Sequence, residues 1–412
     1  MRILAILAGG RGERLKPLTE TRPKAVLPVL DEPLVCRHVR LASSYSSFDK
    51  VVVVVSYEAT QVARALEECG IEAELVNQGG ELGTGDAIAK AMEAGGPGDY
   101  TLIYGDVYVK EEVYELLSKL RAPSVLLAEA RDPSSYGVAR VSPDGFLESI
   151  VEKPSSPLGS SLVFAGLLKL SYEHSSFFKN LKASPRGELE ATDALNEISK
   201  SYEVKVAVAP RDSWVDVGRP WDFLRANIMA LSELREQVIE GDVSEKAEIS
   251  GPVLVKRGSS IKPYTVIEGP AYVGEEAVVG PLAHVRGYTV IGKRAFIGAF
   301  TELKASVVLE RARLPHLNYA GDSVIGEYAN LGAGTKIANL RFDEQEVEMT
   351  VKGVRVKTGL RKLGAVIGGY AKTGINVSIM PGVKIGSYAI IYPGCVVSRD
   401  VERGEVLNCW SR

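Results

Sequence analysis

The second half of the chain carries a six-residue repeat that sharply limits the folds it can adopt. From about residue 242 onward, aliphatic side chains recur six positions apart, with a small residue two positions before each. The first series comprises Val273, Val279, Val285, Ile291, Ile297 and Leu303. This period matches neither an ordinary amphipathic helix nor a hairpin strand. It predicts flat triangular coils, stacked so that one aliphatic side chain per side points into the core.

The same period returns further along the chain, after one interruption. It resumes at Ile325, Leu331 and Ile337, and again from Ile367 to Val397. The pattern resembles the hexapeptide left-handed parallel β-helix. Residues Asn339 to Leu363 break the period and are expected to form an inserted loop, which is of functional interest because long excursions often line sites.

The first 225 residues show a different pattern, in which short apolar runs alternate with helical stretches. The runs Ile3–Leu7, Val51–Val55, Thr101–Tyr104 and Val125–Ala128 are expected to be strands. The stretches Tyr57–Cys69, Asp86–Glu93 and Glu111–Leu120 are expected to be helices. Such alternation predicts an α/β doubly wound, mostly parallel, Rossmann-like sheet with helices on both faces.

The chain is long enough for two domains, and the change of pattern gives their limits. We expect a nucleotide-binding type of α/β domain over residues 1–225, a linker over 220–241 and the β-helix over 242–412. Pro220 to Gln237 is predicted to be the linker helix, with an apolar side that includes Trp221, Leu224 and Leu231.

A glycine-rich loop directly follows the first predicted strand, in the stretch LAGGRGERLKPLTETRPK from Leu7 to Lys24. In α/β proteins, ligands bind at this edge of the sheet. Gly9, Gly10 and Gly12 have no Cβ, so backbone N–H groups can approach phosphate oxygens closely. Arg14 and Lys24 can neutralise charge on a triphosphate. The spacing is neither that of a Walker loop nor that of a dinucleotide fingerprint.

The same stretch, including Pro17, Thr19 and Pro23, resembles the signature of the sugar-1-phosphate nucleotidyltransferases. The resemblance implies that a nucleoside triphosphate is joined to a sugar 1-phosphate with release of pyrophosphate, and that Arg14 and Lys24 are catalytic. Gln78 and the following LGTGDA segment resemble the part that holds a pyrimidine in uridylyl- and thymidylyltransferases, which implies UTP or dTTP. The implied nucleotide-binding residues are Leu7, Ala8, Gly9, Gly10, Gln78, Gly83, Thr84, Tyr104 and Gly105.

Two carboxylates are candidate ligands for Mg²⁺, because both substrates of such a reaction are anionic and hard oxygen donors suit this ion. Asp106 lies in YGDVY just after the predicted strand Thr101–Tyr104, and Asp216 lies in WVDVG after another short apolar run. Each alone is as readily a strand-end residue. As a pair beside the glycine loop, at positions that match the family, they are interpreted as metal ligands.

The sugar-binding residues of the first domain are implied by further family motifs. Tyr136-Gly137 and Glu152-Lys153-Pro154 match the sugar-pocket motifs, in which Gly137, Glu152 and Lys153 contact the sugar phosphate. The chain departs from many relatives at Phe164-Ala165-Gly166, where these have an Asn before a small residue and Gly. The identity of the sugar is therefore left open at this point.

The β-helix carries residues that resemble the acetyltransferase half of bifunctional N-acetylglucosamine-1-phosphate uridyltransferases. The matching segments are TELK, HLNYAGD and NLGAG. The resemblance implies an acetyl-CoA-dependent N-acetylation of glucosamine 1-phosphate, with His316 as the base, Glu302 available to orient its imidazole, and a site formed between subunits of a homotrimer. The implied sugar-phosphate contacts are Arg286, Lys304, Tyr319, Asn330 and Asn339. Ala333 is implied to lie near the CoA thioester, whereas the tail Leu407–Trp410 departs from the family pattern.

Composition excludes several other classes of function. The net charge of −3 and the lack of a Lys/Arg run argue against nucleic-acid binding. No segment approaches the roughly 20 apolar residues of a membrane span. The four cysteines, Cys36, Cys69, Cys395 and Cys409, show neither a CxxC pair nor metal spacing, so reduced thiols in a cytoplasmic protein are expected.

Two alternatives remain beside the bifunctional enzyme. One is a monofunctional glucose-1-phosphate thymidylyl- or uridylyltransferase whose β-helix only oligomerises. The other is a regulatory protein that binds a nucleotide sugar without turnover. The presence of Arg14, Lys24, Asp106 and Asp216 argues against the second, since a sensor need not keep both cations and both carboxylates.

Overall fold

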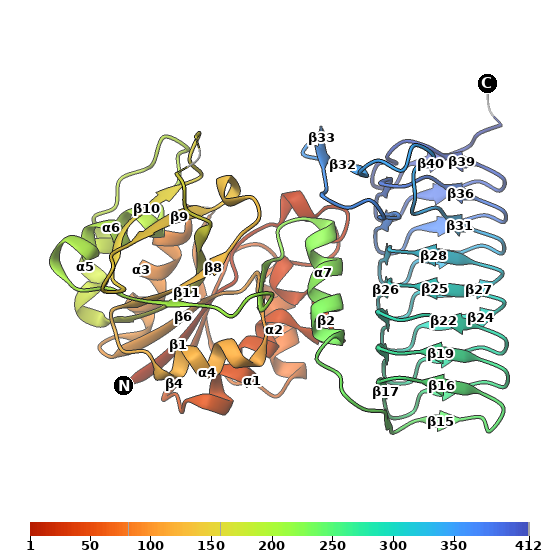
Figure 1. Cartoon of the computed structure of the whole chain (residues 1–412), viewed down its shortest axis with the longest axis horizontal. Coiled ribbons are helices and arrows are strands. Elements are labelled where there is room, and N and C mark those ends of the chain that lie inside the picture. Colours follow the sequence, from red (N-terminus) through yellow and green to blue (C-terminus); the bar gives the residue numbers. More distant parts are fainter. Residues whose placement is uncertain (81, 157, 411–412) are drawn as a thin grey trace. The chain divides into compact units, whose positions relative to one another are not determined.

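The computed structural model describes residues 1–80, 82–156 and 158–410 of the chain. Its backbone divides into two compact units (Figure 1). The α/β unit comprises Met1–Arg11, Pro23–Leu27 and Glu32–Asp216. The β-helical unit comprises Gly12–Arg22, Pro28–Asp31 and Val217–Arg412. Part of the glycine-rich stretch therefore belongs to the same unit as the β-helix.

The α/β unit is built on one mixed sheet with strand order β10-β9-β11-β6-β1-β4-β5, to which β8 and β12 are added through β11 and β8. Its strands are β1 (Arg2–Leu7), β4 (Lys50–Val55), β5 (Glu74–Asn77), β6 (Asp99–Tyr104), β8 (Ser124–Glu129), β9 (Gly137–Val141), β10 (Leu147–Glu152), β11 (Leu162–Ser171) and β12 (Lys205–Val208). Strands β4 and β6 pair in parallel with β1, and β5 pairs in parallel with β4, whereas β11 runs antiparallel to β6, β8 and β9. The four strands expected from apolar runs are all present.

Helices cover both faces of this sheet, as expected for a doubly wound fold. They are α1 (Leu34–Tyr45), α2 (Ala59–Glu68), α3 (Thr84–Gly95), α4 (Glu111–Lys119), α5 (Ser175–Lys179) and α6 (Ala191–Ser201). Apolar side chains of α1, α2 and α4 pack with Leu4 and Ile6 on one face. Those of α3, α5 and α6 pack with Ile3 and Ala5 on the other. Alternate residues of β1 thus enter different cores, which explains why the strand is apolar throughout.

The β-helix consists of short parallel strands that fall, within the described residues, into three sheets. Sheet I contains β14 (Val238–Ile239), β17 (Val253–Val255), β20 (Ala271–Val273), β23 (Thr289–Ile291), β26 (Val307–Val308), β29 (Val324–Ile325), β34 (Val366–Ile367) and β37 (Lys384–Ile385). Sheet II contains β15 (Asp242–Val243), β18 (Ser260–Ile261), β21 (Val278–Val279), β24 (Phe296–Ala299), β27 (Arg313–His316), β30 (Asn330–Leu331), β35 (Lys372–Thr373), β38 (Ile390–Ile391) and β40 (Val406–Leu407). Sheet III contains β16 (Glu248–Ser250), β19 (Val266–Glu268), β22 (His284–Val285), β25 (Glu302–Lys304), β28 (Tyr319–Gly321), β31 (Lys336–Ile337), β36 (Ser378–Ile379) and β39 (Val396–Val397).

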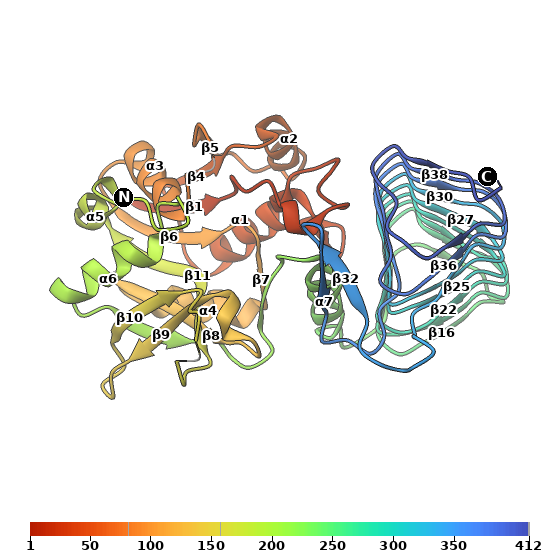
Figure 2. The ribbon, with the colours of Figure 1, turned by 90° about the horizontal axis from the view of Figure 1, so that it is seen from above.

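The repeat of six places one buried aliphatic on each side of a coil. Val273, Val279 and Val285 are fully buried and lie on sheets I, II and III in turn. Successive coils overlie one another in both views (Figures 1 and 2), so each inward column forms a continuous apolar core. The predicted stack of triangular coils is confirmed.

Two expectations about secondary structure need correction. The linker helix α7 (Pro220–Leu231) ends before Gln237, because the backbone N–H groups of Glu233 and Leu234 bond only three residues back and close the helix with a turn. The inserted segment Asn339–Leu363 is not merely a loop, since β32 (Glu348–Val351) and β33 (Val354–Lys357) pair as an antiparallel hairpin.

The expectation of reduced thiols is wrong in this structure. Disulfides join Cys36 to Cys69 and Cys395 to Cys409. Each pair is distant in sequence, but the fold brings the Cα atoms to 6.4 and 5.5 Å, within disulfide range. Among the residues that the structure describes, none of the helices has both the length and the apolar character needed to traverse a lipid bilayer.

Candidate active sites

Lys24 lies between two carboxylates at the carboxyl edge of the α/β sheet. Its ammonium is 2.6 Å from Oδ2 of Asp106 and 3.7 Å from Oδ1 of Asp216. Asp106 follows β6, and Asp216 ends β13 (Trp214–Asp216), which pairs antiparallel with β7 (Val107–Val109) so that Asp216 faces Val107. The Lys24 side chain is only 8% exposed. The sheet register thus brings together three predicted residues that are far apart in sequence.

The two carboxylates suit a magnesium ion that is also bound by substrate. Mg²⁺ is usually held by one or two carboxylates together with substrate phosphates, and not by an all-protein cage. In the described part of the chain, His, Cys, Asp and Glu side chains do not gather in larger groups able to hold a metal ion. The pair of carboxylates that meets at Lys24 fits this mode of Mg²⁺ binding.

The predicted nucleotide-binding backbone lies along the same edge of the sheet. The N–H of Ala8 donates to the carbonyl of Val54, and the N–H of Gly105 donates to the carbonyl of Leu7. A Cβ on Gly9 would lie 2.7 Å from Oε1 of Gln78, so a larger residue would collide with the Gln78 amide. The exposed Gly10 follows directly. The loop and Gln78 are therefore in contact.

Gln78 in turn holds the start of α3. Its Nε2 donates to the carbonyl of Gly83, 2.9 Å away. Gly83 has a φ of 106° and packs against the backbone of Leu189, so this position requires glycine. The hydroxyl of the next residue, Thr84, accepts from the N–H of Ala191 at 3.1 Å. The segment that sequence reasoning assigned to the pyrimidine is thus fixed by three contacts.

Tyr104 lies beside Thr84 and beside the departure from the family pattern at Phe164. Burial raises the pKa of Tyr104, and its hydroxyl bonds to Thr84. The rings of Tyr104 and Phe164 meet edge to face, with centroids 5.6 Å apart. Trp214 donates its indole N–H to the carbonyl of Ala165 at 2.9 Å. Phe164 is therefore a packed aromatic residue and cannot supply the hydrogen bonds of an Asn.

The predicted sugar residues of this unit are joined by an arginine that the sequence did not reveal. Gly137 pairs with Glu152 across β9 and β10, and Lys153 Nζ is 3.7 Å from Glu152 Oε1. Arg186 forms ion pairs with Glu152 at 3.4 Å and Glu190 at 2.5 Å. Burial raises the pKa of Glu152, and the neighbouring cations oppose this effect. Arg186 stands in a short loop without a recognisable motif, so only the fold indicates its place.

Arg14 belongs to the β-helical unit, in the single turn η1 (Glu13–Leu15). The hydroxyl of Thr19 donates to the carbonyl of Gly12 at 2.8 Å and closes this segment. Gly12 itself has a positive φ of 69°.

Sheet III of the β-helix gathers most of the residues predicted for acetyl transfer. Lys304 Nζ lies 3.1 Å from Asp322, whose carboxylate also accepts from the side-chain amide of Asn339. Tyr319 lies in register with Glu302 on the neighbouring strand, and burial raises its pKa. Asp322 lies within the HLNYAGD segment but was not identified from sequence. It links two of the predicted contacts.

Arg286 and Glu302 form an ion pair at 3.1 Å. Within one chain, Glu302 lies on sheet III next to Arg286, whereas His316 ends β27 on sheet II.

His316 is exposed and stands one residue before Leu317, a corner residue with a φ of 52°. Its backbone carbonyl accepts from the N–H of Gly334. Asn330 begins β30 on the same sheet, and the carbonyl of Ala333 accepts from Asn376. His316, Asn330 and Ala333 thus lie on or next to sheet II, while the phosphate-binding candidates lie on sheet III.

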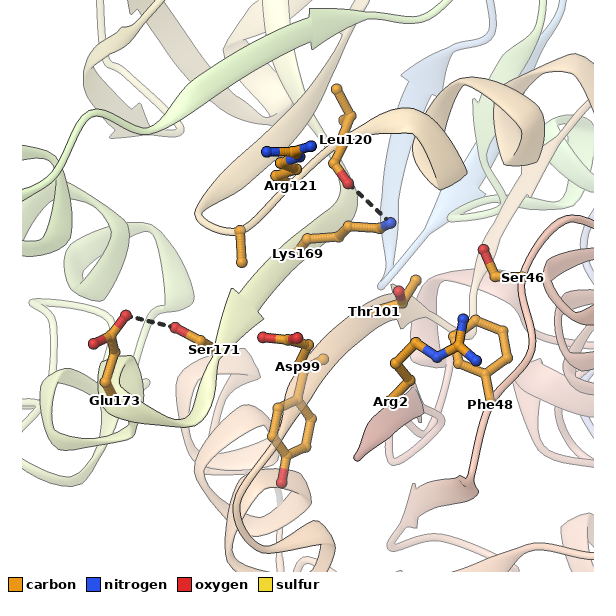
Figure 3. A pocket seen from close by; sticks show the side chains of 12 residues that line it. Arg2, Ser46, Phe48, Asp99, Thr101, Leu120, Arg121, Lys169, Ser171 and Glu173 are labelled. Atoms are coloured by element: carbon orange, nitrogen blue, oxygen red, sulfur yellow. Dashed lines mark hydrogen bonds between the residues drawn. The ribbon is translucent and has the colours of Figure 1, made fainter.

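A cavity of about 440 Å³ lies elsewhere in the α/β unit (Figure 3). Arg2 and Asp99 line it at the amino ends of β1 and β6, opposite the glycine loop. Lys169 lines it from β11 and donates to the carbonyls of Ser118 and Leu120, each at 3.1 Å. The residues described as lining it include none of the predicted site residues, so the cavity is separate from both candidate sites.

Comparison with known proteins matches both units. The Nucleotidyl transferase family matches residues 4–233, and the Bacterial transferase hexapeptide family matches residues 364–399. A bifunctional sugar-1-phosphate nucleotidylyltransferase/acetyltransferase of Sulfurisphaera tokodaii is 42% identical over 97% of this chain and 98% of its own length. The bifunctional protein GlmU of Methanococcus maripaludis is 38% identical over 97% and 95%.

A solved structure matches part of the chain. It is a Bacillus anthracis protein assigned as a glucose-1-phosphate thymidylyltransferase, with 28% identity and a TM-score of 0.50. The match covers 56% of this chain and 95% of that one. Because both family models match and the relatives align over nearly their whole length, the chain belongs to the family of bifunctional enzymes that combine a sugar-1-phosphate nucleotidyltransferase with a hexapeptide-repeat acetyltransferase.

Proposed function

We propose that this enzyme makes UDP-N-acetylglucosamine in two steps. The β-helix N-acetylates glucosamine 1-phosphate with acetyl-CoA, and the α/β domain transfers a nucleotidyl group from UTP, or from dTTP, to the product. The observation that carries the proposal is the convergence of Asp106 and Asp216 on Lys24, beside the glycine loop. Such a site suits a reaction between two anionic phosphates.

In nucleotidyl transfer, an oxygen of the sugar phosphate attacks the α-phosphorus of the triphosphate. The bond from this phosphorus to the β-phosphate oxygen breaks, and pyrophosphate leaves. Arg14 and Lys24 stabilise the negative charge on the phosphates. Asp106 and Asp216 would hold Mg²⁺, which when bound neutralises triphosphate charge.

The base and the sugar are held by separate groups. We assign the pyrimidine to Gln78, Gly83 and Thr84, since the Gln78 amide has both a donor and an acceptor. The backbone of Leu7, Ala8, Gly10 and Gly105, with Tyr104, lines the nucleotide. The sugar 1-phosphate is assigned to Gly137, Glu152 and Lys153, and Arg186 joins this set because of its ion pair with Glu152.

In acetyl transfer, the amine of glucosamine 1-phosphate attacks the thioester carbonyl, and the thiolate of CoA leaves. His316 accepts the proton that the amine loses. Arg286 and Lys304 bind the sugar phosphate, and Tyr319, Asn330 and Asn339 orient the sugar. Asp322 holds Lys304 and Asn339 in place through the contacts described above. Ala333 lies near the thioester.

A homotrimer built through the β-helix is part of this proposal. His316 and Asn330 stand on sheet II, and Arg286 and Lys304 stand on sheet III of the same coil stack. Two copies packed side by side bring sheet II of one against sheet III of the next. Such packing gives each site groups from both sheets, and a closed ring of three copies satisfies all of them.

We assign nucleotidyl transfer to residues 1–225, the linker to residues 220–241 and acetyl transfer to residues 242–412. We also assign the enzyme to the cytoplasm, where its proposed substrates are made. Disulfides are rare in the cytosol except in hyperthermophiles. Thiol titration of protein from its native source, under alkylating lysis, tests whether Cys36 and Cys69 are joined in the cell.

A substrate panel tests the two reactions separately. Pyrophosphate release is measured with UTP or dTTP and each of several sugar 1-phosphates, with and without an N-acetyl group. CoA release is measured with glucosamine 1-phosphate and galactosamine 1-phosphate. We expect turnover in both assays, with the highest kcat/KM for UTP and N-acetylglucosamine 1-phosphate in the first. Nucleotidyl transfer without CoA release would indicate the monofunctional enzyme, and binding without turnover would indicate the regulatory protein.

A further inference from the structure

The β-helical unit holds a segment of the N-terminal sequence, Gly12–Arg22, by specific polar contacts. This segment carries Arg14, one of the cations assigned to the triphosphate, and ends two residues before Lys24. None of the described strands of the three β-helix sheets comes from this segment, so its contacts hold the segment itself and do not build the coils.

Arg22 makes the central contact. Its Nη2 donates to Oε1 of Glu310 and lies 3.2 Å from Oε2 of Glu327. The side chains of Arg22 and Glu327 are only 12% and 4% exposed. Burial raises the pKa of Glu327, and the guanidinium of Arg22 opposes this rise. One cation thus bridges two carboxylates on neighbouring coils, and we call these three residues the Arg22 cluster.

Further contacts extend along the same corner of the β-helix. The hydroxyl of Thr21 donates to Glu327. The carboxylate of Glu20 accepts from the backbone N–H of Ser387 at 2.7 Å, and the Ser387 hydroxyl donates to the carbonyl of Pro17 at 3.4 Å. The segment is therefore held at several points on successive coils.

The stability of the Arg22 cluster depends on all three of its residues. Glu327 is buried and Glu310 is partly buried, at 4% and 28% exposure. Removal of one partner of a buried ion pair costs more than the pair itself contributes, because the other charge is left without a counter-charge. Loss of the guanidinium would leave Glu310 and Glu327 facing each other. The segment Gly12–Arg22 would then move away from the β-helix, so that water could solvate the two carboxylates.

We propose that Arg22, Glu310 and Glu327 are positioning residues for nucleotidyl transfer: they hold Gly12–Arg22 in the conformation that directs Arg14 to the triphosphate. The inference rests on the proposed role of Arg14 in the first reaction. The β-helix then serves both reactions, one through the sheet II and sheet III residues and the other through this corner. None of these three residues needs to touch a substrate.

The test measures both reactions of the full-length enzyme in the variants Arg22→Met and Arg22→Lys. Because a displacement of about 1 Å can cost about 100-fold in rate, we expect kcat/KM for the triphosphate to fall by roughly that factor in Arg22→Met. The KM of the sugar 1-phosphate and the rate of acetyl transfer should stay unchanged. Lysine keeps the charge but has a single donor group, so Arg22→Lys should recover part of the activity.

Arg294→Met is the matched control. Arg294 makes an ion pair of similar length with Glu276, at 2.8 Å, on an exposed part of the β-helix, and we expect it to change neither reaction. If Arg22→Met does not fold, Glu327→Gln replaces it, since the amide keeps the shape and removes the charge, and we expect the same selective loss.

Two outcomes would overturn the inference. One is that both Arg22→Met and Glu327→Gln catalyse nucleotidyl transfer with the same kcat/KM as the wild type. The other is a parallel loss of both reactions, which would mean that the Arg22 cluster only stabilises the fold. A wild-type enzyme without nucleotidyl transfer would instead contradict the proposed function, so the two failures are distinguishable.

Discussion

The ammonium of Lys24 lies 2.6 Å from Oδ2 of Asp106, in the space where the two carboxylates of the α/β site converge. A lysine in this position neutralises the carboxylates when the phosphates of a substrate are absent. If Asp106 and Asp216 hold a divalent cation in the substrate complex, as proposed above, that cation would supply further positive charge for the carboxylates and phosphates. The same residues can therefore serve the free enzyme and the complex.

Substitution of Lys24 should remove this charge from the site. We expect Lys24→Met to lower kcat for nucleotidyl transfer by at least about 100-fold, since loss of one group that stabilises transition-state charge has an effect of this size. Acetyl transfer should be retained. Lys119→Met is the matched control, because Lys119 also lies 2.6 Å from a carboxylate, that of Glu115, but at an exposed helix end. Equal activity of Lys24→Met and the control would refute the assignment.

Removal of divalent cations should separate the two reactions. After treatment with EDTA we expect no pyrophosphate release and unchanged CoA release, and addition of Mg²⁺ should restore the first. Asp106→Asn and Asp216→Asn should each raise the Mg²⁺ concentration needed for half-maximal activity by about 10-fold or more, because each removes a charged ligand. A normal Mg²⁺ requirement in both variants would show that these carboxylates do not bind the metal.

His316→Ala should abolish acetyl transfer and leave nucleotidyl transfer intact. General-base catalysis contributes about 10²- to 10⁴-fold, so CoA release should fall by a factor in this range. His284→Ala is the control, since His284 also lies on the β-helix, has a side chain that is 41% exposed and pairs with Glu268 at 3.1 Å. Normal CoA release in His316→Ala would mean that another group takes the proton.

Asp322→Asn tests the support of the sugar-phosphate contacts. The amide cannot hold Lys304 as an ion pair, and it meets the Asn339 amide less favourably. We expect KM for glucosamine 1-phosphate to rise by about 10-fold, equivalent to about 1.4 kcal/mol, with a smaller change in kcat. If kcat falls and KM stays constant, Asp322 acts in the chemical step and not in positioning.

The stability of the protein should depend on pH through Asp31. Burial raises the pKa of its carboxyl from 3.8 to about 7, although the backbone N–H of Lys293 donates to it. Between these values the folded state binds more protons than the unfolded state, so this group makes the free energy of unfolding fall as the pH rises from about 4 to about 7. The loss is complete above about pH 7.

Asp31→Asn removes this titration and keeps a carbonyl oxygen for the Lys293 N–H. Between pH 5 and pH 8 we expect its Tm to fall less than that of the wild type, by roughly 2 °C or more. Tm is measured by circular dichroism across this range in both proteins. Parallel Tm profiles would show that Asp31 ionises normally in the folded protein.

Local sequence patterns predicted much of the fold, because the burial of apolar side chains at a regular spacing determines the type of each element. Val273, Val279 and Val285 stand six positions apart, and a triangular coil with one repeat on each side buries all three. In the same way, the apolar runs predict the strands, and the glycine-rich loop after the first run predicts which edge of the sheet binds a ligand. Lys24, Asp106 and Asp216 were identified from motifs, and the sheet register brings them together.

The sequence by itself therefore determined the two-part architecture and the chemical class of the enzyme, and it predicted the charged residues that the structure brings together around Lys24. Tertiary structure alone decided which distant groups meet. It paired Arg186 with Glu152, Asp322 with Lys304, Glu302 with Arg286 and the cysteines with each other. Arg22 and Glu310 are 288 positions apart, and no local pattern encodes such a pair. It forms because the buried carboxylate of Glu327 and the neighbouring carboxylate of Glu310 are stabilised by a cation, and the fold brings only certain cations within reach.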